Sequence, residues 1–303
     1  MINEFETYDG EKIFYKRWQA ENEVAIIQIA HGLGEMSDYY EEFAKLANEK
    51  HITVYLNEAR GHGRTKARFN KDNIIEQYVK DIYEQNRQIR KIHTYKPVFI
   101  LGHSLGTLVG QSAILQYPNI WDGLILIGIP YYENILELID GITKEIAENG
   151  ESAESVSTFL KMFSSINDSF SKEEGVLAWL TSDEERRNYY ISLPYTNISY
   201  SNRFYKEFLE KSEEVQGKGI EIYSDKTFPI FILGGGCDVI SKDGTYGKIK
   251  AEQLQDRDFT NVQVKIYLKL RHSILQERDR TQVVDDILKW VKTTNGIVAS
   301  STK

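Results

Sequence analysis

Short apolar runs alternate along this chain with segments whose apolar side chains recur every three to four residues. The runs have the length of buried strands, and the periodic segments have the spacing of amphipathic helices. Strands that are connected through helices lie parallel in a sheet, and the helices cover both of its faces. The pattern therefore predicts an α/β fold built on a mostly parallel sheet.

The predicted elements follow one another in regular order up to about residue 130. Asp9-Gly10 is a favourable turn dipeptide, so the segments on either side of it, 2–8 and 12–19, are predicted to pair as a hairpin. The pattern then predicts strands at 24–30, 52–56, 97–101 and 123–129, and helices at 38–49, 73–93 and 107–117.

A helical insertion interrupts this alternation. Residues 131–224 keep helical periodicity and contain no strong strand pattern, so we expect them to form an inserted helical cap. The alternation then resumes, with strands predicted at 228–233 and 262–268 and helices near 246–256 and at 281–292. The expected domains are a core of residues 1–130 and 225–292, the cap of residues 131–224, and a polar, disordered tail of residues 293–303.

The composition narrows the class of protein. With 41% apolar residues among 303, the chain can bury a large core. The net charge of −8 disfavours a nucleic-acid partner, and the single cysteine, Cys237, cannot form an intramolecular disulfide. No apolar run reaches the roughly 18 residues of a membrane span, and the acidic N-terminus lacks the pattern of a signal peptide. We therefore expect a cytoplasmic protein that touches a membrane surface at most transiently, through the cap.

One short motif carries candidate chemistry. Gly102-His103-Ser104-Leu105-Gly106 lies between a predicted strand and a predicted helix, where Gly-x-Ser-x-Gly is the pattern of a nucleophile elbow. At the tip of so sharp a turn the serine backbone is strained, and only glycine fits on either side of it. Ser104 is therefore the candidate nucleophile, and a tight turn without chemistry is the alternative.

A serine hydroxyl becomes a good nucleophile only beside a base, and the base needs an orienting carboxylate. In doubly wound hydrolases these residues follow the serine in the order acid, then histidine. His272 is the only histidine well beyond Ser104, and it follows the last predicted strand. Asp238 is the first carboxylate after the strand at 228–233, and Asp243 is its rival. We expect Asp238 to orient His272.

An oxyanion hole needs two backbone N–H donors. The Leu105 N–H follows the candidate nucleophile at the start of a helix, and the glycine-rich segment His31-Gly32-Leu33-Gly34 follows the strand at 24–30. We expect Leu105 and Leu33 to supply the two donors. The alternative is that the glycine-rich segment is only a turn between a strand and a helix.

Five ordered motifs carry a family resemblance, namely residues 31–35, 60–63, 102–106, 236–238 and 271–277. Together they resemble the monoacylglycerol lipase and lysophospholipase-like branch of the α/β-hydrolases, a branch of serine aminopeptidase type. The resemblance implies an eight-stranded sheet with a cap after the sixth strand. It also implies a Ser104–Asp238–His272 triad, with Leu33 and Leu105 at the oxyanion hole and His62 and His103 as structural loop residues. Glu58, Thr65 and Ser273 depart from the usual family residues without removing a catalytic group.

The leading interpretation is a hydrolase that cleaves carboxylic esters, such as a monoacylglycerol, a lysophospholipid or another small-molecule acyl ester. Candidate substrate-binding residues in the cap are Tyr189, Tyr190 and Tyr195, although packing of cap helices is an equal explanation for most of them. The scattered histidines and the lone Cys237 indicate neither a metal nor a cofactor.

Two alternatives remain open. A catalytically silent binding protein is one, and an intact triad argues against it. An aminopeptidase or amidase on the same triad is the other, because cap carboxylates could hold a free amine. The cap carboxylates are Glu133, Glu137, Glu145, Glu173, Glu174, Asp183, Glu184 and Glu185.

Overall fold

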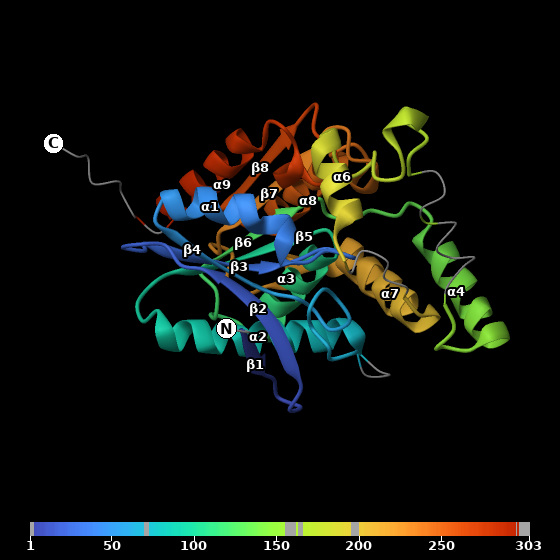
Figure 1. Ribbon diagram of the computed structural model, residues 1–303, viewed down its shortest axis with the longest axis horizontal. Helices are drawn as coiled ribbons and strands as arrows, with labels where there is room; N and C mark the ends of the chain where they lie inside the picture. The colour runs from blue at the N-terminus through green and yellow to red at the C-terminus, as the bar shows by residue number, and fades with distance from the viewer. Residues whose placement is uncertain are drawn as a thin grey trace.

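Eight strands form one sheet in the order β1-β2-β4-β3-β5-β6-β7-β8 (Figure 1). The computed structural model describes residues 3–69, 73–154, 162, 166–194, 200–294 and 296. The sheet is parallel from β4 through β3 to β8, whereas β1 pairs antiparallel with β2 and β2 pairs antiparallel with β4. The strands are β1 (Glu4–Glu6), β2 (Lys12–Trp18), β3 (Ala25–Ala30), β4 (Ile52–Asn57), β5 (Val98–His103), β6 (Gly123–Ile127), β7 (Ile230–Gly235) and β8 (Val262–Tyr267). The α/β class, the hairpin and the mostly parallel sheet are thus confirmed.

Helices cover both faces of the sheet, as expected from the alternation (Figure 1). On one face α1 packs against α9, and on the other α2 packs against α3. The core helices are α1 (Glu41–Glu49), α2 (Ile74–Ile92), α3 (Leu105–Gln116), α8 (Thr245–Gln255) and α9 (Arg280–Thr294), with short 3-10 turns η1 (Ser37–Tyr40), η4 (Val239–Ser241) and η5 (Ile274–Gln276).

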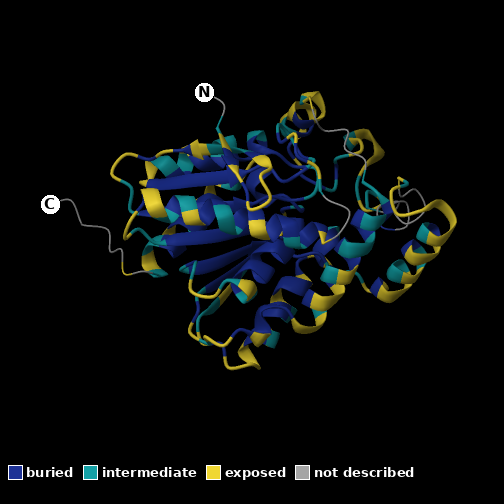
Figure 2. Cartoon of the chain, turned by 90° about the horizontal axis from the view of Figure 1, so that it is seen from below, coloured by how far each residue is buried: buried dark blue, intermediate teal, exposed yellow. Residues whose placement is uncertain are grey.

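Burial on both faces explains why the sequences of the central strands are continuous apolar runs. Successive side chains of a strand point to opposite faces, and both faces of this sheet are covered. On β5, Ile100 belongs to one hydrophobic cluster and its neighbours Phe99 and Leu101 belong to the other. Figure 2 shows the result, with buried strands at the centre of the molecule and exposed residues towards its outside.

In the described part of the segment between β6 and β7, the helices are α4 (Ile135–Asn149), η2 (Lys172–Glu174), α6 (Glu184–Ser192), α7 (Asn202–Lys218) and η3 (Ile220–Ile222). Among the described residues of this segment there is no strand, and the one β-bridge joins Glu154 to Ser201. Helix α4 packs against α7, which itself lies against α2 and α3 of the core. The insertion therefore follows the sixth strand, and the division into core and cap stays a prediction.

The C-terminal helix corrects one predicted boundary. Helix α9 continues through Thr293 and Thr294, which the sequence assigns to the tail, because Val291 still packs into the core below them. Apart from Gly296, the rest of the predicted tail lies outside the described residues.

In the described part of the chain no helix is both long enough and apolar enough to cross a bilayer.

The motif at residues 60–63 has a structural role in this fold. Arg60 is completely buried, and its guanidinium lies 2.8 Å from Asp81 of α2 and 2.7 Å from Asp9 in the turn between β1 and β2. A buried arginine requires such partners, since an unpaired buried charge is very costly. Arg60 thereby joins the loop after β4 to α2 and to the N-terminal hairpin.

Candidate active site

The turn between β5 and α3 has the geometry of a nucleophile elbow. Ser104, at its tip, has φ 52° and ψ −118°, a conformation that non-glycine residues rarely adopt. A Cβ atom on Gly102 would lie 2.2 Å from the Gly106 carbonyl oxygen, and one on Gly106 would lie 1.8 Å from the Ala30 carbonyl oxygen. Both glycines are therefore required by close backbone approach, for the steric reason that the sequence pattern implies.

His272 and Asp238 meet at the same end of the sheet. The His272 Nδ1 atom lies 2.9 Å from Asp238 Oδ1, and both side chains are buried. Asp238 Oδ1 also accepts a hydrogen bond of 3.0 Å from the Ile240 N–H. Burial alone would raise the pKa of Asp238, but His272 and these hydrogen bonds lower it below its usual value. The rival carboxylate, Asp243, is exposed, so the structure brings Asp238 rather than Asp243 to His272.

A single backbone segment lies next to both the serine and the histidine. The Ser104 N–H donates a hydrogen bond of 2.9 Å to the Ile127 carbonyl at the end of β6. The next residue, Gly128, has φ +62°, and a Cβ atom there would lie 3.1 Å from Cε1 of His272. Gly128 thus lets the imidazole approach the end of β6, beside the turn that carries Ser104.

A buried ion pair links the elbow to the glycine-rich loop after β3. Glu35 Oε1 lies 2.9 Å from His103 Nδ1, and Glu35 Oε2 accepts hydrogen bonds from the Gly32 N–H (2.7 Å) and the Tyr40 hydroxyl (2.6 Å). On its other side, His103 Nε2 lies 3.4 Å from the His272 carbonyl oxygen. Burial opposes both charges, yet the pairing lowers the pKa of Glu35 to about 2 and raises the pKa of His103. Glu35 thereby joins the loop of Leu33 to the elbow, a role that the sequence does not predict.

This ion pair leads to a pH-dependent prediction. The stabilisation from Glu35 is complete above its usual pKa of 4.5 and is lost as the pH falls towards 2. The stabilisation from His103 is complete below its usual pKa of 6.5 and is lost as the pH rises through its higher folded pKa. Both are present between these limits, so Glu35→Gln is expected to lower the free energy of unfolding by roughly 3–5 kcal/mol at about pH 5.5, and by less at about pH 9.

Urea unfolding at the two pH values measures this difference. Glu49→Gln is the matched control, because Glu49 is exposed at the end of α1 and its replacement should leave stability unchanged at both values. An equal loss of stability for Glu35→Gln at both pH values would contradict the ion pair.

The helical insertion between β6 and β7 directly contacts the loop that carries His272. The Trp179 ring lies 5.2 Å from the His272 ring, and the Leu180 carbonyl accepts a hydrogen bond of 2.8 Å from the Ser273 N–H. Nearby, the Arg271 guanidinium lies 2.7 Å from Glu174. The sequence does not single out Trp179, since nothing in its local pattern separates it from other apolar cap residues.

The candidate substrate-binding tyrosines have different positions. Tyr190 is completely buried and stacks on Tyr39 with 3.8 Å between ring centroids, and its hydroxyl donates to the Gln276 side chain. Tyr189 is 39% exposed. Tyr195 lies outside the described residues. The contacts of Tyr190 are those of a residue that packs the insertion against the core, which is the alternative to substrate binding given above.

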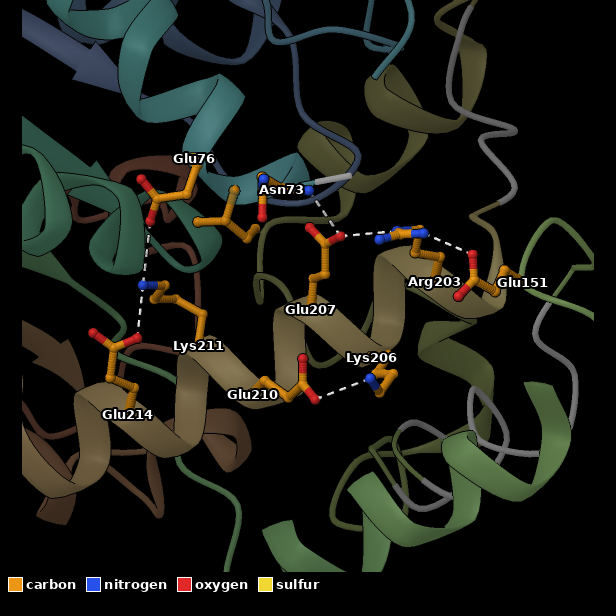
Figure 3. A pocket seen from close by; sticks show the side chains of 10 residues that line it. Asn73, Glu76, Glu151, Arg203, Lys206, Glu207, Glu210, Lys211 and Glu214 are labelled. Carbon is orange, nitrogen blue, oxygen red and sulfur yellow. Dashed lines mark hydrogen bonds and ion pairs between the residues drawn. The ribbon is translucent and has the colours of Figure 1, made fainter. Parts of the chain in front are cut away.

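A separate charged groove of about 360 Å³ lies between α7 and the start of α2 (Figure 3). Its five carboxylates share three cations: Arg203 contacts Glu151 and Glu207, Lys211 contacts Glu76 and Glu214, and Lys206 contacts Glu210. Glu207 also accepts a hydrogen bond of 3.0 Å from the Asn73 N–H at the start of α2. These contacts hold α7 against the core and leave the groove with two more carboxylates than cations.

Two of the carboxylates that could hold a free amine have other partners in the structure. Glu174 pairs with Arg271, and the Asp183 side chain caps α6 by accepting from the Glu185 and Arg186 N–H groups. Among the described residues, no group of three His, Cys, Asp or Glu side chains is arranged to hold a metal ion.

Comparison with known proteins gives the family. The model of the family described as serine aminopeptidase, S33, matches residues 21–279. The chain belongs to this α/β-hydrolase family. Its resemblance to the monoacylglycerol lipase branch is confirmed by the relatives that follow, and so is the eight-stranded sheet that the family fold implies.

Several monoacylglycerol lipases are among the relatives of this S33 family member. It is 28% identical over 120 residues to monoglyceride lipase of Rattus norvegicus, a match that covers 39% of this chain and 40% of the rat protein. The chain thus spans about two fifths of the length of that relative. It is 20% identical over 284 residues to monoacylglycerol lipase of Mycolicibacterium smegmatis, with 93% of each chain covered.

Solved structures share the whole fold of this family member. A structure described as a lipase in its open form superposes with a TM-score of 0.87 at 23% identity, covering 97% of this chain and 98% of its own. A soluble variant of monoglyceride lipase from Saccharomyces cerevisiae superposes with a TM-score of 0.74 at 20% identity, covering 97% and 95%. At these identities the likeness establishes the fold alone.

Proposed function

We propose that this protein is a serine hydrolase that cleaves carboxylic esters, with a monoacylglycerol, lysophospholipid or similar acyl ester as substrate. The observation that carries the proposal is the 2.9 Å bond from His272 Nδ1 to Asp238 Oδ1, at the end of the sheet where Ser104 occupies a strained elbow. The relatives named as monoacylglycerol lipases support the ester and the acyl chain.

In the proposed mechanism Asp238 and His272 activate Ser104. A carboxylate only accepts hydrogen bonds, so Asp238 holds the proton of His272 on Nδ1 and leaves Nε2 as the base. Nε2 takes the proton from the Ser104 hydroxyl as its oxygen attacks the ester carbonyl carbon. The positive charge that forms on the ring is stabilised by the buried Asp238 carboxylate.

The oxyanion of the tetrahedral intermediate is bound by the N–H groups of Leu33 and Leu105. Leu105 is the first residue of α3, so its N–H has no partner within the helix. In the loop after β3 the Gly32 N–H is held by Glu35, and the next N–H along the chain, that of Leu33, is the proposed second donor. Collapse of the intermediate breaks the ester bond, and His272 Nε2–H protonates the leaving alcohol.

Water then releases the acid by the same route in reverse. His272 Nε2 removes a proton from water, the resulting hydroxide attacks the acyl–Ser104 ester, and the ring returns the proton to the Ser104 oxygen. No group other than those of the chain and water is needed for the atoms and charges to balance.

The proposed substrate class is consistent with the apolar character of the insertion. Its residues Phe204, Phe208 and Leu209 belong to the same large hydrophobic cluster as Leu105, the residue after the proposed nucleophile. Apolar side chains are suited to binding an acyl chain rather than a charged group. We propose that residues 131–224 act as a cap over the active site. A cytoplasmic location stays a prediction from the acidic composition.

The competing activity is peptide-bond cleavage, which the family description as a serine aminopeptidase favours. Purified protein is tested on p-nitrophenyl esters and on aminoacyl p-nitroanilides, which report acyl transfer to water from an ester and from an amide. We expect ester hydrolysis to exceed anilide hydrolysis by at least about 100-fold in kcat/KM, a difference of about 2.7 kcal/mol in transition-state binding. The reverse preference would assign the aminopeptidase activity instead.

A further inference from the structure

Backbone hydrogen bonds attach the loop of His272 to the insertion between β6 and β7. The Ser273 N–H donates a bond of 2.8 Å to the Leu180 carbonyl, and the His272 N–H donates a longer one, of 3.4 Å, to the Trp179 carbonyl. The Trp179 ring also lies beside the His272 ring, with an angle of 37° between the two planes. The backbone and the side chain of His272 are therefore both in contact with residue 179 of the insertion.

A buried carboxylate, that of Glu277, binds the same loop and the same insertion. Glu277 directly follows η5 and is completely buried. Its Oε1 atom accepts a hydrogen bond of 2.9 Å from the N–H of Arg271, the residue before His272. Its Oε2 atom accepts one of 3.0 Å from the Ser182 N–H and another from the Ser182 hydroxyl. One side chain thus joins the loop of His272 to the insertion.

The side chain of Arg271 adds a second attachment between these two segments. Its guanidinium lies 2.7 Å from Glu174 Oε2 and donates a hydrogen bond of 2.6 Å to the Ala178 carbonyl. It also lies over the ring of Phe170, 4.3 Å from the centroid. Arg271 is therefore bound to the insertion by its side chain, while Glu277 binds its backbone N–H.

We propose that Glu277 is a positioning residue through which the insertion fixes the place of His272; this inference rests on the proposed function. The bond from His272 Nδ1 to Asp238 orients the imidazole ring. The position of the backbone that carries the ring depends instead on the N–H groups of residues 271–273, which bind Glu277 and the insertion. A misplacement of about 1 Å in a catalytic geometry costs about 10²-fold in rate, so these bonds affect proton transfer from Ser104.

The consequence is that residues 178–182 form a fixed wall of the active site rather than a lid that opens. Separation of this segment from the loop of His272 would take the Ser182 donors away from the Glu277 carboxylate. A buried carboxylate without donors is very costly, so the closed arrangement is strongly favoured. The insertion thereby contributes to kcat and not to substrate affinity alone.

Glu277→Gln keeps the shape of the side chain and removes one acceptor. An amide has a single oxygen, so glutamine accepts from the Arg271 N–H or from the Ser182 N–H and faces the other with its own NH₂ group. We expect kcat for a p-nitrophenyl ester to fall about 5–30-fold with KM changed less than about 2-fold, because the ester binds as before while the base is displaced. The rate constant for fluorophosphonate labelling of Ser104 should fall by a similar factor, since phosphonylation uses the same base.

Glu221→Gln is the matched control. Glu221 is also a buried carboxylate, but it lies in η3 and its partner is Lys250 of α8, at 2.6 Å, rather than the loop of His272. Its replacement should leave kcat and the labelling rate within about 2-fold of the wild type. All rates are measured at a temperature at which circular dichroism shows every variant folded.

Arg271→Met provides a second variant, which decides the matter if Glu277→Gln does not fold. It removes the bonds to Glu174 and Ala178 while an unbranched side chain still covers Phe170, so the second attachment is lost. We expect kcat to fall about 3–10-fold, again with KM changed less than about 2-fold.

A His272→Ala background separates positioning from a general effect on the structure. The residual activity of such a variant comes from binding and from the oxyanion donors. Because Glu277 acts through His272, adding Glu277→Gln or Arg271→Met to His272→Ala should leave the residual rate within about 2-fold. A merely structural role would lower the rate by the same factor in both backgrounds.

Three outcomes overturn the inference. They are an unchanged kcat in either folded variant, a rise in KM with kcat unchanged, and equal losses in the wild-type and His272→Ala backgrounds. Failure of the proposed function is a separate result, because wild-type protein would then not react with a fluorophosphonate at Ser104 at all. Reaction at Ser104 together with normal turnover of Glu277→Gln would refute the positioning role alone.

Discussion

Ser104→Ala is expected to lower kcat/KM for ester hydrolysis by at least about 10⁴-fold. The alanine has no oxygen to attack the carbonyl, so no acyl-enzyme can form, and only the residual effect of the oxyanion donors remains. Rates on a p-nitrophenyl ester measure the change. Alanine and serine both carry a Cβ atom, so the strain of the elbow backbone is the same for both, and the fold should be unaffected.

Ser112→Ala is the matched control for this variant. Ser112 is a buried serine further along α3, and its replacement should leave kcat/KM within about 2-fold of the wild type while testing the same helix. Full activity of Ser104→Ala would contradict the nucleophile assignment, as would an equal loss of activity in both variants.

Asp238→Asn is expected to lower kcat by about 10⁴-fold at neutral pH. The asparagine can turn its NH₂ group towards His272 Nδ1, which then becomes an acceptor, so the ring proton moves to Nε2. In that tautomer the imidazole has no lone pair at Nε2 to receive the serine proton. The variant should still fold, since asparagine has nearly the shape of aspartate.

The rival carboxylate supplies the control. Asp243 lies five positions further along the chain and is exposed, so Asp243→Asn should leave kcat unchanged. A large loss in Asp243→Asn with activity retained in Asp238→Asn would transfer the orienting role to Asp243.

The order of the elements could be predicted because each strand of a covered parallel sheet is apolar on both faces. The runs that contain Ile26 and Ile100 appear as strands for this reason, and both residues are buried in the sheet. The elbow could be predicted because its steric demand is local: Gly102 and Gly106 contact backbone within the same motif or the adjacent strand.

The supporting contacts of the site could not be predicted, because they join residues that are far apart in sequence. Glu35 pairs with His103, Tyr200 bonds to His62, and Trp179 lies against His272. Nothing in the local pattern around any of these residues specifies its partner. The motifs contain Glu35 and several histidines, but only the tertiary fold determines that Glu35 pairs with His103.

The cap was the part least open to prediction from sequence. Its periodicity indicates helices, and α4, α6 and α7 are present, but amphipathic spacing does not say which neighbour each helix packs against. The tyrosines illustrate this: Tyr190 packs on Tyr39 of the core, whereas Tyr200 reaches the loop of His62.

The most direct test of the account is covalent labelling with a fluorophosphonate followed by mass spectrometry of the intact protein and its peptides. The probe phosphonylates a serine only when a base and an oxyanion hole activate it. We expect one adduct per chain on wild-type protein, located at Ser104, and none on Ser104→Ala. Absence of an adduct on folded wild-type protein, or equal labelling of Ser104→Ala, would contradict it.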